Sequence, residues 1–232
     1  MRFAGIKSLR DLDRQGWVGW VDLLLDGGNP LSLEEFKYLL GLGGYFSRYD
    51  SSNPRLSHPV LSSGEHSDLY LDPASAIAEH PGFAMLCAHA LMEKIKSEVR
   101  LESGSWLVGA SSSAEELIGS LGWFYRNAYE VDVCCGLLDY NVVYGERQSD
   151  SNAMALLADV LVGDASLLER VTGVMSGNNL QFCPFLFVLA SYCDLCEGNG
   201  LRVVPVFTFE RKLWDKDECP CCQRGSEALS VS

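Results

Sequence analysis

From residue 60 onward, the sequence alternates short apolar segments with amphipathic segments, and this pattern limits the fold more than any other feature. The predicted strands cover 106–108, 141–144, 154–160, 185–190 and 203–209. The predicted helices between them cover 84–99, 113–121 and 166–174. Strands that alternate with helices form a parallel sheet with crossover connections. We therefore predict an α/β fold in which about five mostly parallel strands are flanked by helices.

The first 60 residues have a different pattern. An apolar helical face runs from Trp17 to Leu25 and ends at the turn sequence 27–30. Ser32 and Glu35 form a capping box that opens a second amphipathic helix. We predict an N-terminal helical cap or hood over residues 1–60. The α/β domain then covers residues 61–232 and carries a cysteine-rich C-terminal segment.

Charge and hydropathy exclude two classes of partner. The chain has 18 Lys and Arg against 31 Asp and Glu, a net charge of −13, and it has no lysine between Lys96 and Lys212. Nucleic-acid binding needs clustered basic residues, so no nucleic acid is expected as a partner. The most apolar stretch, 182–192, is shorter than the ~20 residues of a membrane span. We expect a cytoplasmic protein with no membrane contact.

Three segments, in order, resemble the orotate-type phosphoribosyltransferases. They read SSGEHSDLYLD over 62–72, LLADVLVGDAS over 156–166 and WDKDECPCCQRG over 214–225. The first looks like the family's early S-G-x-x-S-x-x-Y hairpin, and the second sits where the family carries its phosphoribosyl pyrophosphate motif. The third resembles the C-terminal D-x-x-x-C-P-x-C-x-x-G of orotate-like members. The resemblance implies a phosphoribosyltransferase-like fold with a small hood.

The resemblance also implies roles for individual residues. Ligands of parallel sheets bind beyond the carboxyl ends of the strands, where backbone N–H groups and a helix N-terminus can hold phosphate. Asp159 would hold the ribose and Arg147 the developing negative charge, while Mg²⁺ would coordinate the pyrophosphate. The implied substrate-binding residues are Ser166, Gly163 and Ala165 at the 5′-phosphate, Ser111, Ser112 and Ser113 at the pyrophosphate, and Tyr70 in the early hairpin.

The motif nevertheless departs from the family pattern. Ala158 replaces the first acid, Val162 replaces a threonine and Asp164 replaces a glycine. At an effective dielectric of about 20, a carboxylate ~4 Å from a phosphate charge costs ~4 kcal/mol. The loop that follows Arg147 is short and has no lysine. These changes favour a degenerate, non-catalytic protein that acts as a ligand-binding or protein-interaction module.

Two alternatives stay open. The first is an active orotate-like phosphoribosyltransferase, which would transfer ribose 5-phosphate from phosphoribosyl pyrophosphate to a pyrimidine-type base. The second is a homodimeric structural or regulatory protein, because members of the family commonly pair. If binding is retained, the expected ligand is phosphoribosyl pyrophosphate or a nucleotide-like small molecule.

Nine cysteines, several of them closely spaced, suggest metal binding. Cys193 and Cys196 form one C-x-x-C pair, and Cys219 and Cys222 form another. Two such pairs can present four thiolates to a structural Zn²⁺. The alternative is that these are reduced, unliganded thiols.

The four histidines are a separate group of candidates. His66 lies in the first of the three family-like segments and is a candidate site residue. His58, His80 and His89 are expected to cap helices or to pack. No arrangement of serine, histidine and acid points to hydrolysis.

Overall fold

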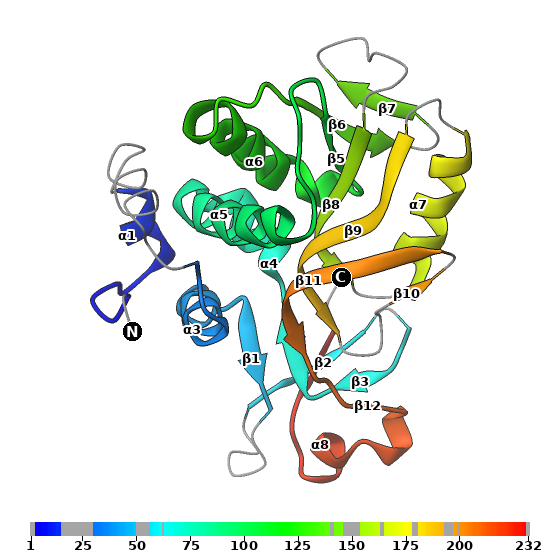
Figure 1. The fold of residues 1–232 in the computed structure, drawn as a ribbon. Helices are drawn as coiled ribbons and strands as arrows, with labels where there is room; N and C mark the ends of the chain where they lie inside the picture. The colour runs from blue at the N-terminus through cyan, green and yellow to red at the C-terminus, as the bar shows by residue number, and fades with distance from the viewer. Residues whose placement is uncertain are drawn as a thin grey trace.

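The computed structural model describes residues 3–14, 30–49, 56–61, 63–139, 142–145, 154–162, 165–177, 181–192, 197–198 and 200–230. The predicted α/β architecture is confirmed: a central sheet lies between helices (Figure 1). The helix expected at 17–25 lies outside the described residues, and so does the loop that contains Arg147.

The central sheet has seven strands in the order β10-β11-β9-β8-β5-β6-β7. The inner five are parallel, and β10 and β7 are antiparallel edge strands. The strand expected at 141–144 is the edge strand β7, and the second parallel strand is β6, which the sequence pattern did not reveal. The bounds are β5 Trp106–Gly109, β6 Cys134–Asp139, β7 Val142–Gly145, β8 Met154–Val162, β9 Gln181–Tyr192, β10 Glu197–Gly198 and β11 Leu201–Phe209.

Helices cover both faces of this sheet. Helices α5 (Pro81–Glu98) and α6 (Glu115–Ala128) pack on one face, and α7 (Ala165–Gly177) packs on the other (Figure 1). Strand β8 is buried on both sides, which explains why its sequence is a nearly continuous apolar run. Within the described ranges, no helix is both long enough and apolar enough to cross a membrane.

The N-terminal helices extend the larger of the two cores. They are α1 (Leu9–Asp13) and α3 (Leu33–Gly43), and α4 (Pro73–Glu79) lies between them and α5 in the sequence. The predicted capping box of α3 is present, since the Glu35 N–H donates to Ser32 Oγ and the Ser32 N–H donates to the Glu35 carboxylate. Phe36 of α3 stacks on Phe207 of β11 with ring centroids 4.4 Å apart. The domain boundary at residue 60 stays a prediction.

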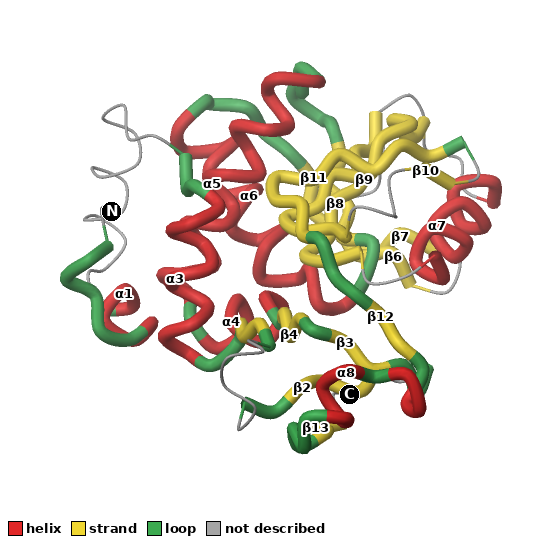
Figure 2. The backbone as a smooth tube through the Cα atoms, turned by 90° about the horizontal axis from the view of Figure 1, so that it is seen from below, coloured by secondary structure: helices red, strands yellow, loops and turns green. Residues whose placement is uncertain are grey.

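A second, four-stranded sheet joins an early hairpin to the C-terminal segment. Its order is β12-β3-β2-β13, with β2 at His58–Val60, β3 at His66–Ser67, β12 at Leu213–Trp214 and β13 at Ala228–Ser230. Figure 2 shows this sheet below the central sheet, with α8 (Pro220–Gln223) beside it. Since β12 follows the end of β11 after three residues, the small sheet lies at the carboxyl end of that strand. We call the small sheet and α8 the hood; it is not the N-terminal cap or hood predicted over residues 1–60. A separate two-stranded sheet pairs β1 (Phe46–Arg48) with β4 (Leu69–Leu71).

A carboxylate of α1 caps the N-terminus of α5. Asp13 Oδ1 accepts a hydrogen bond from the Gly82 N–H at 2.9 Å, and Asp13 Oδ2 lies 3.0 Å from His80 Nδ1. A Cβ atom at Gly82 would lie only 2.8 Å from the carbonyl carbon of Leu12. The absence of a side chain at this position therefore allows α1 to approach α5.

We predict that Gly82→Ala lowers the free energy of unfolding by about 1–3 kcal/mol, because α1 must move away from α5. Gly119→Ala is the matched control, since a Cβ there meets nothing within 4 Å. That control should raise stability by about 0.5–1 kcal/mol through helix propensity. Urea unfolding of both variants measures the difference. Equal stabilities for the two variants would show that the close approach is not required.

Candidate functional site

Asp159 is the buried acid at the carboxyl edge of the central sheet. It lies near the end of β8 and is 1% exposed. Its Oδ1 accepts hydrogen bonds from Ser111 Oγ at 2.8 Å and from the Val160 N–H at 2.7 Å. Ser111 Oγ is in turn 2.7 Å from Ser113 Oγ. The structure thus brings together one predicted ribose-binding residue and two predicted pyrophosphate-binding residues.

Backbone packing positions the serine loop against β8. The Ala110 N–H donates to the carbonyl of Ala158 at 2.9 Å, so the chain leaving β5 stays beside β8. Gly109 precedes this point, and a Cβ there would lie 2.6 Å from the Leu137 side chain. Arg170 of α7 donates to the Ala110 carbonyl at 2.9 Å and fixes the same loop from the other side.

The electrostatics of Asp159 are set by burial. Burial raises the pKa of Asp159 to about 6, although hydrogen bonds from Ser111 and Val160 and the nearby Arg170 charge act in the opposite direction. Oδ2 is buried and has no hydrogen-bond partner among the described residues. A buried acceptor without a donor is costly, and a ligand hydroxyl would satisfy it.

The other residues predicted at the phosphate loops follow β5 and β8, and the structure describes only some of them. Ser112 is exposed in the short 3₁₀ helix Ser112–Ala114, and Ser166 is exposed in the first turn of α7, which begins at Ala165. Gly163 and Arg147 lie outside the described residues, as does Asp164.

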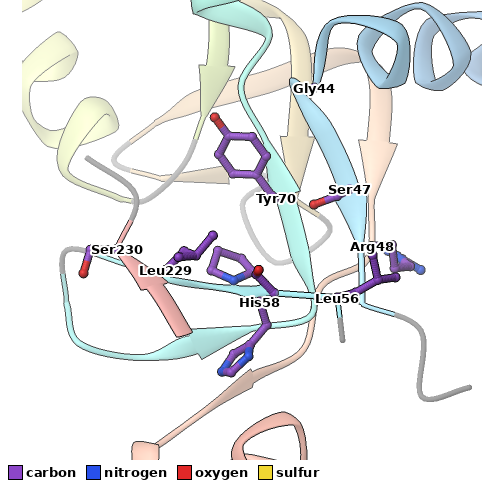
Figure 3. A pocket seen from close by; sticks show the side chains of 10 residues that line it. Gly44, Ser47, Arg48, Leu56, His58, Tyr70, Leu229 and Ser230 are labelled. Atoms are coloured by element: carbon purple, nitrogen blue, oxygen red, sulfur yellow. The ribbon is translucent and has the colours of Figure 1, made fainter. Parts of the chain in front are cut away.

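Tyr70 lies apart from Asp159 and lines a cavity between the hood and the β1–β4 pair (Figure 3). The cavity has a volume of about 430 Å³, and Tyr70 of β4 donates to Asp72 Oδ2 at 3.3 Å. Burial and the Asp72 carboxylate raise the pKa of Tyr70. The lining residues are Gly44, Ser47, Arg48, Leu56, Ser57, His58, Pro59, Tyr70, Leu229 and Ser230.

A cluster of histidines and cysteines lies in the hood. The ligand atoms of His58, His66, Cys219 and Cys222, which we call the His/Cys cluster, all lie within 4.8 Å of one another. Three of these side chains are buried, and Cys222 is half-buried. Burial lowers the pKa of His58, which keeps its imidazole neutral at physiological pH. Figure 3 shows the His58 ring pointing away from Tyr70 and the cavity.

The cluster differs in part from the metal site expected from the sequence. Cys219 and Cys222 belong to it, whereas Cys193 and Cys196 lie outside the described residues. His66 is one of the predicted site residues, whereas the sequence predicts only capping or packing for His58. The two histidines are eight positions apart in the sequence, and the pairing of β2 with β3 brings them together.

Comparison with known proteins shows a sequence similarity to orotate phosphoribosyltransferases. The orotate phosphoribosyltransferase of Sulfurimonas denitrificans is 29% identical over 189 residues, which cover 74% of this chain and 89% of that protein. The enzyme of the same name from a Sulfurovum species is 28% identical, with coverage of 78% and 94%. No family model matches the sequence.

Solved structures show the same fold. Leishmania donovani UMP synthase superimposes with a TM-score of 0.55 at 16% identity, covering 78% of this chain and 36% of that one. Orotate phosphoribosyltransferase from Aeropyrum pernix gives a TM-score of 0.52 at 16% identity, covering 73% and 91%. The chain is an orotate phosphoribosyltransferase-like protein.

The phosphoribosyl pyrophosphate motif of this orotate phosphoribosyltransferase-like chain falls on β8 and α7. The motif runs from β8 to the first turn of α7, as the strand-turn-helix pattern predicted. Ala158, which stands where the family has its first acid, pairs with Gly109 of β5 and is fully buried. Val162 is also buried. The only carboxylate that the described part of this motif presents is therefore Asp159.

We predict that Asp159→Asn stabilises the protein at pH 8 by up to about 3 kcal/mol, and not at pH 4. The pKa of Asp159 rises from 3.8 to about 6 on folding, so the wild-type protein loses stability as pH rises through this window. Asparagine keeps the acceptor at Oδ1 and does not titrate. Chemical unfolding between pH 4 and pH 8 measures the change. The exposed carboxylate variant Glu169→Gln should give a curve parallel to wild type, and a parallel curve for Asp159→Asn would contradict the prediction.

Proposed function

We propose that this orotate phosphoribosyltransferase-like protein is non-catalytic and acts as a ligand-binding or protein-interaction module. The observation that carries the proposal is that Asp159 is buried and already hydrogen-bonded within the protein. This acid is 1% exposed, and its Oδ1 is held by Ser111, which belongs to the loop that would bind pyrophosphate. A sugar would have to open the buried end of β8 before it could reach the carboxylate.

The charge of the chain supports the same proposal. The substrate of the family is polyanionic, and binding it calls for basic groups and unobstructed backbone N–H groups. Here Asp164 adds a carboxylate to the expected phosphate loop, and Glu115 and Glu116 begin α6 immediately after the serine loop. No lysine between Lys96 and Lys212 balances these charges.

An active orotate phosphoribosyltransferase is the second candidate, and two observations favour it. The relatives with that name align over about nine-tenths of their length. The unpartnered Asp159 Oδ2 is also an acceptor that a ribose hydroxyl would satisfy. Carboxylate oxygen is a ligand that Mg²⁺ accepts, so Asp159 is also the residue in the described motif that fits this ion. In this reading Arg147 supplies charge stabilisation, and a homodimer is the expected assembly.

Calorimetry with phosphoribosyl pyrophosphate and MgCl₂ separates the two candidates. We expect no binding tighter than about 1 mM, because a site of this charge lacks several kcal/mol of the required affinity. We also expect no pyrophosphate release when orotate is added. Micromolar binding together with orotate-dependent pyrophosphate release would overturn the non-catalytic proposal.

A double variant makes this test sharper. Val162→Thr with Asp164→Gly restores the family's hydroxyl and glycine and removes one negative charge. Its affinity for phosphoribosyl pyrophosphate should exceed that of wild type by at least about tenfold. Glu34→Gln also removes one charge but lies on the exposed face of α3, and it should change nothing. Equal affinities for the wild type and the double variant would show that Val162 and Asp164 do not weaken phosphoribosyl pyrophosphate binding.

A further inference from the structure

We propose that the His/Cys cluster binds one structural Zn²⁺ through His58 Nε2, His66 Nδ1 and the sulfurs of Cys219 and Cys222. Imidazole nitrogen and cysteine sulfur are the usual ligands of structural zinc, and Cys₂His₂ is one of its common sets. This set shares two cysteines with the four-cysteine site expected from the sequence and replaces the other two with histidines.

The hydrogen bonds around His58 fix its tautomer for metal binding. Ser226 Oγ donates to the Leu56 carbonyl at 2.6 Å, because a carbonyl can only accept. Ser226 Oγ therefore accepts from His58 Nδ1–H, which lies 2.8 Å away. His58 Nε2 is left unprotonated, with its lone pair directed at His66 and the two cysteines. A histidine ligand that donates its other ring N–H to an oxygen is a general feature of zinc sites.

Hydrogen bonding alone does not account for the contacts of this lone pair. His58 Nε2 lies 2.8 Å from His66 Nδ1, 3.4 Å from Cys222 Sγ and 3.6 Å from Cys219 Sγ. One nitrogen lone pair can accept from only one of these three groups at good geometry. A single cation among the four atoms uses every lone pair at once.

The separations fit a tetrahedral ion. Zinc–nitrogen bonds of ~2.05 Å and zinc–sulfur bonds of ~2.3 Å imply nitrogen–sulfur edges of roughly 3.6 Å and a nitrogen–nitrogen edge of roughly 3.3 Å. Three of the four nitrogen–sulfur distances, at 3.3, 3.4 and 3.6 Å, are close to the first value. The two histidine nitrogens, at 2.8 Å, need to separate by only about 0.5 Å.

Charge balance also suits the burial of the site. Two thiolates and two neutral imidazoles around Zn²⁺ give a formal charge of zero, whereas four thiolates would leave −2. Uncompensated charge is expensive in a buried site. Cys219 is fully buried, and His58 and His66 are 1% and 3% exposed, so the neutral set is the favoured one here.

The ion would join parts of the chain that are distant in sequence. His58 and His66 lie on β2 and β3. More than 150 residues later, Cys219 is the N-cap residue of α8 and Cys222 lies within that helix. His58 also belongs to the lining of the 430 Å³ cavity. The zinc therefore fixes the C-terminal segment to the early hairpin and holds one wall of that cavity in place.

Metal analysis of the full-length protein purified without chelator tests the proposal. We expect about one zinc per chain in wild type and less than about 0.1 in Cys222→Ser and His66→Ala. Cys221→Ser is the matched control, because Cys221 is buried in the same turn but is not in the cluster. Cys193→Ser tests the alternative four-cysteine site. Both Cys221→Ser and Cys193→Ser should keep their zinc.

Cobalt substitution of wild type keeps the test independent of how the variants fold. Co²⁺ in a two-nitrogen, two-sulfur site should show the intense visible bands of tetrahedral cobalt and a thiolate charge-transfer band, and added Zn²⁺ should abolish both. The proposal is overturned if wild type holds less than about 0.1 zinc and gives no tetrahedral cobalt spectrum. It is equally overturned if zinc is lost in Cys193→Ser but kept in His66→Ala.

Discussion

The hood depends on the pairing of the β2–β3 hairpin with the C-terminal segment. Strands this short are not stable as an isolated hairpin, and each leaves one edge with unpaired backbone groups. Strand β12 pairs with β3, with Trp214 opposite His66, and β13 pairs with β2, with Ala228 opposite His58. These two registers bring the cysteine turn against the two histidines. The cavity wall at His58 and the position of α8 both follow from this closure.

Buried polar groups distinguish the two sites that this arrangement creates. At the carboxyl ends of the central strands, one oxygen of Asp159 accepts hydrogen bonds from Ser111 and Val160. The other oxygen has no partner among the described residues. In the hood, the ligand atoms of the His/Cys cluster lie within 4.8 Å of one another, and hydrogen bonds can use only some of their lone pairs. The negative charge of −13 matters differently at each. It would disfavour a polyanionic ligand at the first site, and at the second it suits the divalent cation that we propose.

The sequence was sufficient for the fold class, because strands buried on both faces leave continuous apolar runs and their helices keep a single apolar stripe. Strand β6 was missed because it begins Cys-Cys-Gly, residues without a strong preference for strands, and Gly136 weakens the signal further. The approach of Ser111 to Asp159 follows the predicted position of the serine loop at the carboxyl edge. The partnership of His58 with Cys219 could not be read from spacing, since it requires the pairing of segments about 160 residues apart. The sequence spacing instead predicts Cys193 and Cys196 as the partners of the C-terminal pair, because they also form a C-x-x-C pair.

Anomalous X-ray diffraction from a crystal of the native protein, recorded above and below the zinc absorption edge, is the most direct test of this hood. We expect one anomalous peak among the four cluster residues, about 2.0–2.1 Å from His58 Nε2 and His66 Nδ1 and about 2.3 Å from the sulfurs of Cys219 and Cys222. A map with no peak at the cluster, or with its peak bound by Cys193 and Cys196, would contradict the account.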